Sequence, residues 1–267
     1  MAVNPAQVCL FIPAGLKKFK LDLFNRIGKK IEAHGGRVVH HDPKGLEALP
    51  PEVTPIVGCM PECVYLMNEW WKTGRQWIYW DRGYARRVFA TWLPRGDNGG
   101  YYRWHLNTLQ MNRIADVPGD RWQALKIPLR PWRKGGDKII VASTLHHYFD
   151  MFGVPGWPEK IAAEIRTYTK RPVIVRHKET TVPLDVELAD AHCLVAHGSI
   201  AAVEAVIMGC PVFVDKSNAA ALVGRTDFRE IDHPVYPDNR EAWVHSLAYS
   251  QFNEQELVDG TLWKLIT

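Results

Sequence analysis

A turn of small residues near position 197 carries the side chains best suited to bind a phosphorylated ligand. His197-Gly198-Ser199 follows an apolar run, Cys193 to Ala196, that is too short for a helix, and apolar residues with helical spacing come after it. This order predicts a buried strand, a tight turn and a helix. The N–H groups at the start of a helix favour phosphate. A carboxylate such as Glu204, one turn into the helix, has the chemistry to accept hydrogen bonds from ribose hydroxyls.

The end of this predicted helix is marked as clearly as its start. Ser199 is a suitable N-cap, Gly209 before Pro211 predicts the end of the helix, and the run to Val214 predicts another buried strand. A generic strand–turn–helix–strand unit, with Glu204 on a solvated helix face, has the same pattern. The local sequence therefore leaves both interpretations open, a phosphate site and a purely structural unit.

The stretch from residue 188 to residue 215 resembles the nucleotide-sugar signature in the C-terminal domain of GT-B glycosyltransferases, including the capsule-polysaccharide type. The resemblance is carried by His197-Gly198-Ser199, Glu204-Ala205, Gly209 and Pro211. It implies that His197, Gly198 and Ser199 meet the diphosphate of a nucleotide sugar, with a UDP-sugar expected, and that Glu204 meets the ribose.

The same resemblance suggests roles for two further segments. Arg176 and Lys178 follow a predicted strand at 173–175, where the family has basic contacts to the nucleotide phosphates. The family more often has prolines there, so only the cationic role is carried over. The loop at 215–221, which contains Ser217, corresponds to a segment that closes around the donor in similar proteins. The tail from residue 242 is similar to phage-encoded proteins of this type.

An acid and an arginine follow a second predicted strand. Trp77 to Trp80 is rich in aromatic and β-branched residues, and Asp81-Arg82-Gly83 comes directly after it. Ligands of α/β proteins bind at the carboxyl ends of the strands. We therefore expect Asp81 to act as the general base that deprotonates an acceptor hydroxyl, with Arg82 beside it. The alternative is an ion pair between Asp81 and Arg82, Arg86 or Arg87 that only caps the sheet.

Charge and aromatic residues favour a polyanionic acceptor. The net charge of +4 hides an asymmetry, because residues 1–135 hold 21 lysines and arginines against 11 acids, whereas residues 136–267 hold 12 against 18. Eight of the 11 tryptophans also lie in the first part. Rings and cations can stack an extruded base and meet its phosphates. We expect contacts to double-stranded DNA with modified bases from Arg86, Arg87, Tyr102, Arg103 and Trp104. Core aromatics with a solvated arginine surface are the alternative.

The order of predicted elements indicates the fold. A strand at 8–12, an amphipathic helix at 19–33 and a strand at 38–40 predict a doubly wound α/β domain. Residues 128–136 are rich in prolines, glycines and cations, which is typical of a domain junction. With the resemblance, this gives a GT-B-like α/β fold of two Rossmann-like domains facing each other across a cleft. Residues 1–134 would bind the acceptor and residues 135–267 the nucleotide sugar, with the last helix crossing back to the first domain.

Several classes of protein lack their sequence signals here. The chain has no GxSxG, GxxxxGK[ST] or GxGxxG motif, and no Asp-x-Asp triplet of the kind that marks a metal-dependent donor site. The five cysteines form no CxxC pair, which favours reduced thiols. No apolar run approaches the roughly 20 residues that span a bilayer, and no export signal is evident, so we expect a cytoplasmic location, that of the host cell if the protein is phage-encoded.

The sequence therefore predicts a metal-independent glycosyltransferase. The expected acceptor is a hydroxymethylated pyrimidine base in phage DNA. Two alternatives remain open: a glycosyltransferase of surface polysaccharide or lipopolysaccharide, and a phage protein that binds a nucleotide without turnover.

Overall fold

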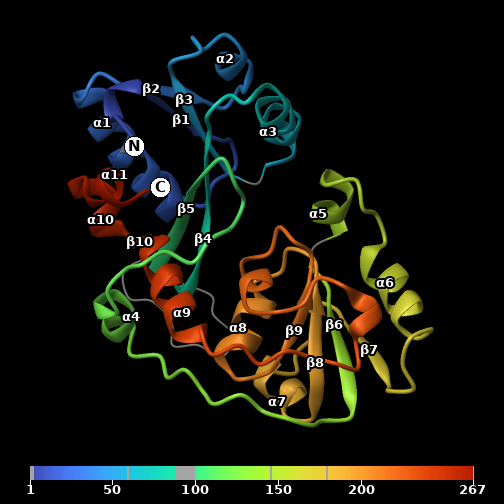
Figure 1. Cartoon of the computed structure of the whole chain (residues 1–267). Helices are drawn as coiled ribbons and strands as arrows, with labels where there is room; N and C mark the ends of the chain where they lie inside the picture. The colour runs from blue at the N-terminus through green and yellow to red at the C-terminus, as the bar shows by residue number, and fades with distance from the viewer. Residues whose placement is uncertain (1–2, 59, 88–99, 145, 179, 267) are drawn as a thin grey trace. The chain divides into compact units, whose positions relative to one another are not determined.

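The computed structural model describes residues 3–58, 60–87, 100–144, 146–178 and 180–266 (Figure 1). Within this range the chain forms two compact units. Unit 1 comprises Met1–Val88, Arg95–Leu109 and Tyr249–Thr267, and unit 2 comprises Phe89–Pro94 and Gln110–Ala248. Each unit has its own sheet with parallel strands and flanking helices. The α/β class with two Rossmann-like units, predicted from the sequence, is thereby confirmed.

Unit 1 is built on a six-stranded sheet in the order β10-β5-β4-β3-β1-β2. Strands β1, β2, β3 and β4 run parallel to one another. Strands β5 and β10 pair antiparallel at one edge of the sheet. Its strands are β1 (Val8–Ile12), β2 (Arg37–His40), β3 (Thr54–Gly58), β4 (Ile78–Arg87), β5 (Gly100–Leu106) and β10 (Gln251–Asn253). Its helices are η1 (Pro5–Gln7), α1 (Lys18–Ala33), α2 (Lys44–Glu47), α3 (Pro61–Thr73), α10 (Glu254–Asp259) and α11 (Thr261–Leu265).

The core of unit 1 lies where α1, α10 and α11 cover one face of this sheet, and α3 lies on the opposite side (Figure 1). Helix α1 buries Leu23, Phe24, Ile27 and Ile31, whose spacing of three and four residues places them on one helical face. The ring of Phe24 contacts aromatic side chains from the central strands of the sheet. This packing fixes the strands whose carboxyl ends carry the candidate residues of unit 1.

Unit 2 has a four-stranded parallel sheet in the order β7-β6-β8-β9. The strands are β6 (Lys138–Ala142), β7 (Val173–Arg176), β8 (Ala191–Ala196) and β9 (Val212–Val214). The helices are α4 (Asp120–Leu125), α5 (His146–Met151), α6 (Trp157–Ile165), α7 (Leu184–Leu188), α8 (Ala201–Ile207), η2 (Ala219–Leu222), η3 (Phe228–Glu230) and α9 (Arg240–Tyr249). Apolar side chains of α6 pack against β6, β7 and β8.

The units divide the chain at places other than the predicted junction near residue 134. Residues 110–134 belong to unit 2, where the backbone N–H of Arg130 donates to Ile207 at 2.9 Å and that of Arg133 donates to Gly209 at 2.7 Å. The last 19 residues, 249–267, belong to unit 1, because β10 pairs with β5. The segment at 128–136 is thus an extended part of unit 2. Its prolines and glycines are equally typical of a linker, so the sequence does not distinguish the two.

This division also removes most of the charge asymmetry. Unit 1 contains 16 lysines and arginines against 12 acids, and unit 2 contains 17 against 17. Six tryptophans fall in unit 1 and five in unit 2. The net charges of +10 for residues 1–135 and −6 for residues 136–267 depended on a junction near residue 134. They therefore give little support to a polyanion-binding domain.

The C-terminal elements differ from the sequence prediction. The apolar residues Trp243, Leu247 and Phe252 predict one amphipathic helix, but Phe252 lies in β10, fully buried. The apolar residues Leu257, Leu262, Trp263 and Ile266 predict a second amphipathic helix, but this segment forms two short helices, α10 and α11, separated by Gly260 with φ of 93°. That left-handed backbone favours glycine and ends a helix.

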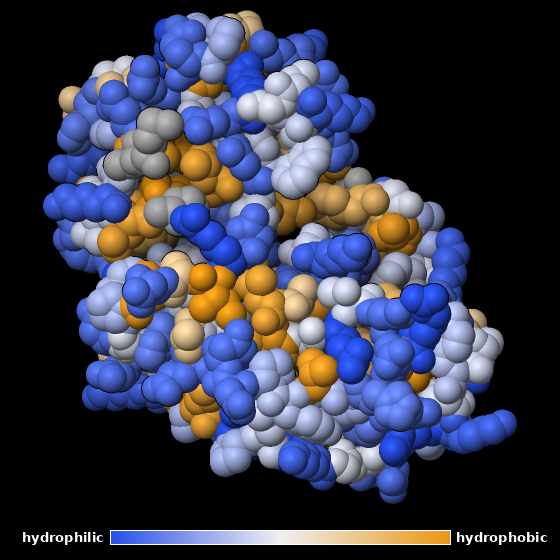
Figure 2. All heavy atoms as spheres, in the orientation of Figure 1, coloured by the Kyte–Doolittle hydropathy of each residue, from blue (hydrophilic) through white to orange (hydrophobic). Residues whose placement is uncertain are grey.

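The face of the molecule seen in Figure 2 is mostly hydrophilic, with apolar residues gathered in several smaller patches. Among the described residues, no helix combines the length and the apolar character that a membrane crossing requires.

Candidate functional site

The carboxyl edge of the unit 2 sheet collects several of the predicted residues. All four strands are parallel, so their carboxyl ends meet at one edge: Arg176 ends β7, His197 follows β8 and Asp215 follows β9. The chain passes from β6 to β7 on one side and to β8 on the other, which makes the gap between β6 and β8 the topological switch point. Open α/β sheets bind ligands in the crevice at that point.

Two buried amides hold the turn at 197–199. Asn218, 1% exposed, donates from Nδ2 to the carbonyl oxygens of His197 at 2.7 Å and Ser199 at 3.1 Å. Gln110, 3% exposed, donates from Nε2 to the carbonyl oxygen of Gly198 at 2.9 Å. The carbonyls of all three turn residues are therefore fixed on the protein side, which preorganises the turn.

Glycine is required within this turn. A Cβ atom at position 198 would lie 1.8 Å from the Tyr148 hydroxyl oxygen, so only glycine admits that ring. The Ser199 hydroxyl accepts a bond from the Ala201 N–H at 3.3 Å. Helix α8 begins one residue later than the predicted Ser199 cap implies and is only seven residues long. The principal feature of the site is therefore the arrangement of the turn and not the dipole of a long helix.

His197 lies among aromatic side chains. Its ring makes edge contacts with Tyr148, Phe149 and Trp157, with centroid distances of 6.0, 6.4 and 5.5 Å. Burial lowers the pKa of His197, and the carboxylate of Asp215 only partly opposes this shift. A neutral imidazole is therefore favoured at neutral pH, with a ring nitrogen available as donor or acceptor.

The loop after β9 is organised by Asp215. Its Oδ1 accepts bonds from the Ser217 backbone N–H at 2.9 Å and from the Ser217 hydroxyl at 2.6 Å. Burial acts to raise the pKa of Asp215, but the Ser217 bonds and His197 lower it overall. Ser217 is exposed, as a residue that meets a ligand has to be, and it lies beside the Asn218 clamp.

The three other residues predicted to contact the nucleotide sugar lie in different surroundings. Glu204 is 2% exposed, so the alternative of a solvated helix face is wrong. Arg176 forms an ion pair with Glu187 and donates to the Val182 carbonyl at 2.8 Å, so its guanidinium is directed to α7 and the loop before it. Lys178 is exposed beyond the end of β7. The role of each toward a nucleotide stays a prediction.

Asp81 of unit 1 follows the last parallel pair of β3 and β4, Gly58 with Trp80. Its Oδ2 accepts bonds from Arg103 Nη2 at 2.8 Å and from the Tyr79 hydroxyl at 3.2 Å, and its Oδ1 accepts from the Arg82 N–H at 2.7 Å. The side chain remains 39% exposed. An ion pair was anticipated as the alternative to catalysis, but the partner is Arg103 of β5.

Cations surround this carboxylate. Arg82 is exposed, and Lys20 of α1 lies over the Trp80 ring at 5.8 Å. Burial lowers the pKa of Lys20, the charge of Arg82 lowers it further, and the charge of Asp81 opposes both. Around Asp81 the carboxyl edge of unit 1 thus combines an acid with several cations, an arrangement that suits an acidic ligand.

The predicted DNA contacts in β5 are corrected by the structure. Tyr102 and Trp104 are each 2% exposed and belong to the core of unit 1, where they cannot stack on a base. Arg103 is 5% exposed and faces the opposite side of the sheet. Arg86 is half-buried with φ of 51°, and the side chain of Arg87 lies outside the described residues. Alternation along β5 explains the result, because a run of rings and cations supplies both faces of one strand.

Sequence reasoning missed the residues that hold the two sites in place. Gln110 and Asn218 carry no motif, and only long-range contacts reveal them. Tyr79 and Arg103 carry a usable signal, because residues at positions i and i+2 of a strand share one face. That signal needs the pairing register of β4 and β5, which the sequence does not provide.

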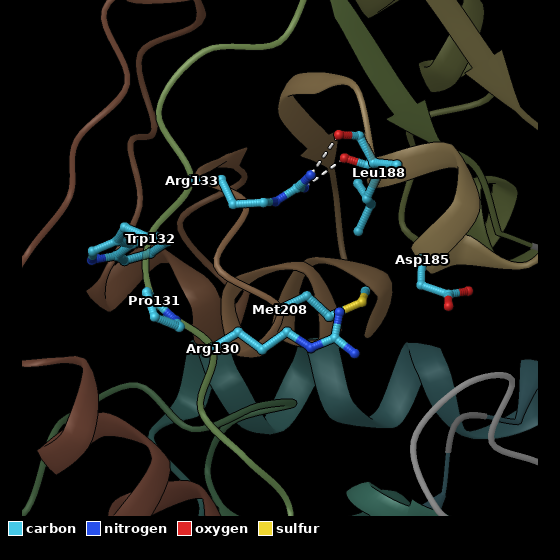
Figure 3. Close-up of a pocket in the computed structure, with 8 residues that line it drawn as sticks. Arg130, Pro131, Trp132, Arg133, Asp185, Leu188 and Met208 are labelled. Atoms are coloured by element: carbon cyan, nitrogen blue, oxygen red, sulfur yellow. Dashed lines mark hydrogen bonds between the residues drawn. The ribbon is translucent and has the colours of Figure 1, made fainter.

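Figure 3 shows a separate pocket of unit 2, with a volume of about 450 Å³. It lies beside the ends of α7 and α8, and Arg133 crosses its rim to donate to the Leu188 and Ala189 carbonyls (Figure 3). Arg130, Asp185 and Met208 also line it, and it includes none of the predicted site residues. Among the residues that the structure describes, no group of three or more histidine, cysteine or acidic side chains is placed to hold a metal ion.

Comparisons with known proteins give a structural likeness only. No family model matches the sequence, and no curated protein matches it. The structure is similar to that of the β-Kdo 2,7 transferase of Thermosulfurimonas dismutans KpsC, with a TM-score of 0.54 and 10% identity, over 96% of this chain and 98% of that one. The β-Kdo 2,4 transferase of the same KpsC matches with a TM-score of 0.49 and 11% identity, over 93% and 92%. The first likeness shows that the two chains share a fold.

Proposed function

We propose that the protein is a glycosyltransferase that moves a sugar from a nucleotide-sugar donor to a hydroxyl of an anionic surface polysaccharide. The observation that carries this proposal is the preorganised turn at 197–199, at the switch point of a fold shared with a Kdo transferase. The same fold can host unrelated functions, so the arrangement of the site supports the activity and the fold supports only its plausibility.

In this proposal the donor phosphates bind at the turn. Preorganised N–H groups stabilise charge as it develops on the leaving nucleotide, without reorganisation during the reaction. Ser217 and the neutral His197 contribute hydrogen bonds from the flanking loops. Glu204 would meet the ribose if donor binding opens a path to its buried carboxylate. UDP-sugars are the expected donors, and no metal ion is required.

Unit 1 supplies the acceptor side. Asp81 takes the proton of the acceptor hydroxyl as the sugar is transferred, and the proton remains on the carboxyl until solvent removes it. Arg82 and Lys20 provide positive charge beside this group. An acidic polysaccharide fits such a surface, and the chain of similar fold is a β-Kdo 2,7 transferase.

A donor and acceptor panel tests the proposal. The protein is incubated with UDP-, CMP- and GDP-sugars and with anionic oligosaccharides, with and without EDTA, and products are identified by mass spectrometry. We expect transfer with at least one donor and no effect of EDTA. Donor binding without transfer or hydrolysis would instead support a nucleotide-binding protein without turnover.

DNA carrying hydroxymethylated pyrimidines is the other acceptor in the same panel. The burial of Tyr102 and Trp104 in the core of unit 1 weakens that alternative. Gel shifts at two salt concentrations separate the acceptors, because a DNA-binding enzyme loses affinity steeply as salt rises. Glucosylated nucleosides in the digest, with no oligosaccharide product, would favour the DNA acceptor.

A further inference from the structure

The antiparallel pair β4 and β5 has two chemically different faces. Trp80 lies opposite Trp104 on the face that packs into the core. On the other face the register places Tyr79 opposite His105 and Asp81 opposite Arg103. Directly opposed residues of an antiparallel pair have Cβ atoms about 5 Å apart, so Asp81 and Arg103 meet because of the register itself.

The guanidinium of Arg103 is deeply buried on this face. It lies between the rings of Tyr79 and Tyr84, at 5.7 and 5.5 Å from their centroids. Its Nη2 donates to Asp81, while Nε and Nη1 have no hydrogen-bond partner among the described residues. A buried cation that uses one of its nitrogens in this way is costly.

The charge of Arg103 is balanced by Asp81. Burial alone would lower the pKa of Arg103, but the Asp81 carboxylate and the flanking tyrosines raise it overall. His105 adds no charge, because burial and the nearby Arg103 lower its pKa to about 3. Arg103 and Asp81 therefore form a pair of opposite charges in which only the acid is partly exposed to solvent.

The hydrogen bonds also fix the orientation of the carboxylate. Oδ2 is held by Arg103 and Tyr79, and Oδ1 accepts from the backbone N–H of the next residue. Each of these donors comes from a strand and not from a loop. A carboxylate held by rigid elements is what a reaction with strict geometry requires.

We propose that Arg103 is a positioning residue that orients the Asp81 carboxylate, and that the Tyr79 hydroxyl helps to hold the same carboxylate. This inference rests on the proposed glycosyl transfer. Arg103 itself touches no substrate, because it is 5% exposed. Its effect reaches the reaction through the orientation and the charge of the Asp81 carboxylate.

Four variants test the inference. Arg103→Met removes the charge and the donor, Arg103→Lys keeps a charge, and Tyr79→Phe removes only the hydroxyl bonded to Asp81. Tyr84→Phe is the matched control, because its ring also flanks the guanidinium but its hydroxyl bonds His105, at 2.8 Å. For each variant we measure kcat with the donor and acceptor found in the panel, the donor Kd by calorimetry, and Tm.

We expect Arg103→Met to lower kcat by about 100-fold, the cost of misplacing a reacting group. We expect Tyr79→Phe to lower it by about 5- to 10-fold, with the donor Kd unchanged in both. Arg103→Lys should recover part of the loss, and Tyr84→Phe should keep wild-type kcat. If Arg103→Met fails to fold, the two tyrosine variants decide the question.

Equal kcat in Tyr79→Phe, Tyr84→Phe and the wild type would overturn the inference. So would equal losses in the two tyrosine variants, because packing around the guanidinium would then explain the effect. A wild type without turnover on any donor would overturn the proposed function as well, which distinguishes the two failures.

Discussion

Gln110 donates from Nε2 to the carbonyl oxygen of Gly198 at 2.9 Å, and it is the first residue of unit 2 after β5. Its Oε1 also accepts from the Ala219 N–H at 3.0 Å. Three residues earlier, Asn107 is fixed in unit 1 by two bonds to the Trp77 backbone, both of 2.9 Å. The donor turn is thus held by the residue at which the chain enters unit 2 after β5.

Loss of the Gln110 side-chain bonds should weaken donor binding. Gln110→Met keeps the length of the side chain but releases the Gly198 carbonyl, so the turn loses part of its preorganisation. We expect the donor Kd to rise about 10-fold, equivalent to about 1.4 kcal/mol, measured by calorimetry.

The control for Gln110→Met is Gln251→Met in unit 1. Gln251 is also buried, and its Oε1 accepts bonds from the N–H groups of Tyr84 and Ala85 at 2.8 and 2.9 Å. Both variants should lose stability, but Gln251→Met should bind the donor as the wild type does. Equal donor affinity of Gln110→Met and the wild type would show that the turn does not depend on this clamp.

Asp81→Asn should abolish most turnover without affecting donor binding. Removing a general base costs about 10²- to 10⁴-fold in rate, so kcat should fall within that range while the donor Kd stays constant. The variant also leaves the buried charge of Arg103 uncompensated. We expect a loss of up to about 3 kcal/mol in the free energy of unfolding, less than for a fully buried pair because Asp81 is 39% exposed.

Wild-type turnover in Asp81→Asn would remove Asp81 from the mechanism. A fall in kcat that followed only from unfolding would be recognised by urea denaturation, since the folded fraction at the assay temperature is then known.

The stability of unit 1 should depend on pH through His105. The pKa of His105 is lowered from 6.5 to about 3 by burial, and the unfolded chain therefore binds a proton that the folded chain does not. Stability is fully present above pH 6.5 and is lost as the pH falls toward 3. One such group contributes a slope of up to about 1.4 kcal/mol per pH unit in that window.

Urea denaturation at several pH values between 4 and 7 measures this slope. His105→Gln removes the titrating group and keeps a polar side chain at the position, so its curve should be flatter than that of the wild type. Parallel curves for the two proteins would mean that His105 is not held neutral in the folded state.

Trp104 should contribute to stability rather than to ligand binding. It is 2% exposed, and its ring lies 6.4 Å from that of Phe24. Trp104→Ala should cost about 3–5 kcal/mol of unfolding free energy. Trp71, which is 67% exposed, is the matched control, and Trp71→Ala should stay within about 0.5 kcal/mol of the wild type. A Trp104→Ala protein with wild-type stability and altered acceptor affinity would show that Trp104 contributes to ligand binding and not to the core.

The sequence alone was sufficient for the elements that bury a regular apolar pattern. The predicted strand at 8–12 coincides with β1, and the predicted helix at 19–33 agrees with α1 to within one residue. The apolar run at 138–142 also predicts a strand, and it coincides with β6. In each case local periodicity and burial act together, which is the condition under which pattern reasoning succeeds.

The errors arose where long-range pairing decides the outcome. Phe252 follows the apolar residues Trp243 and Leu247 of α9, yet it lies in β10 because an edge of β5 is available to pair with it. Arg103 and Trp104 were grouped as one surface because they are adjacent in sequence, but strand alternation places them on opposite faces. The junction near 134 was inferred from composition, and contacts of Arg130 and Arg133 to unit 2 override it.

Binding of a sugar nucleotide's phosphates at the turn 197–199 can be seen in a crystal structure with a non-hydrolysable nucleotide sugar. We expect phosphate oxygens within about 3 Å of the Gly198 or Ser199 backbone N–H. Phosphates located elsewhere, for example beside Arg130 in the pocket of Figure 3, would contradict it.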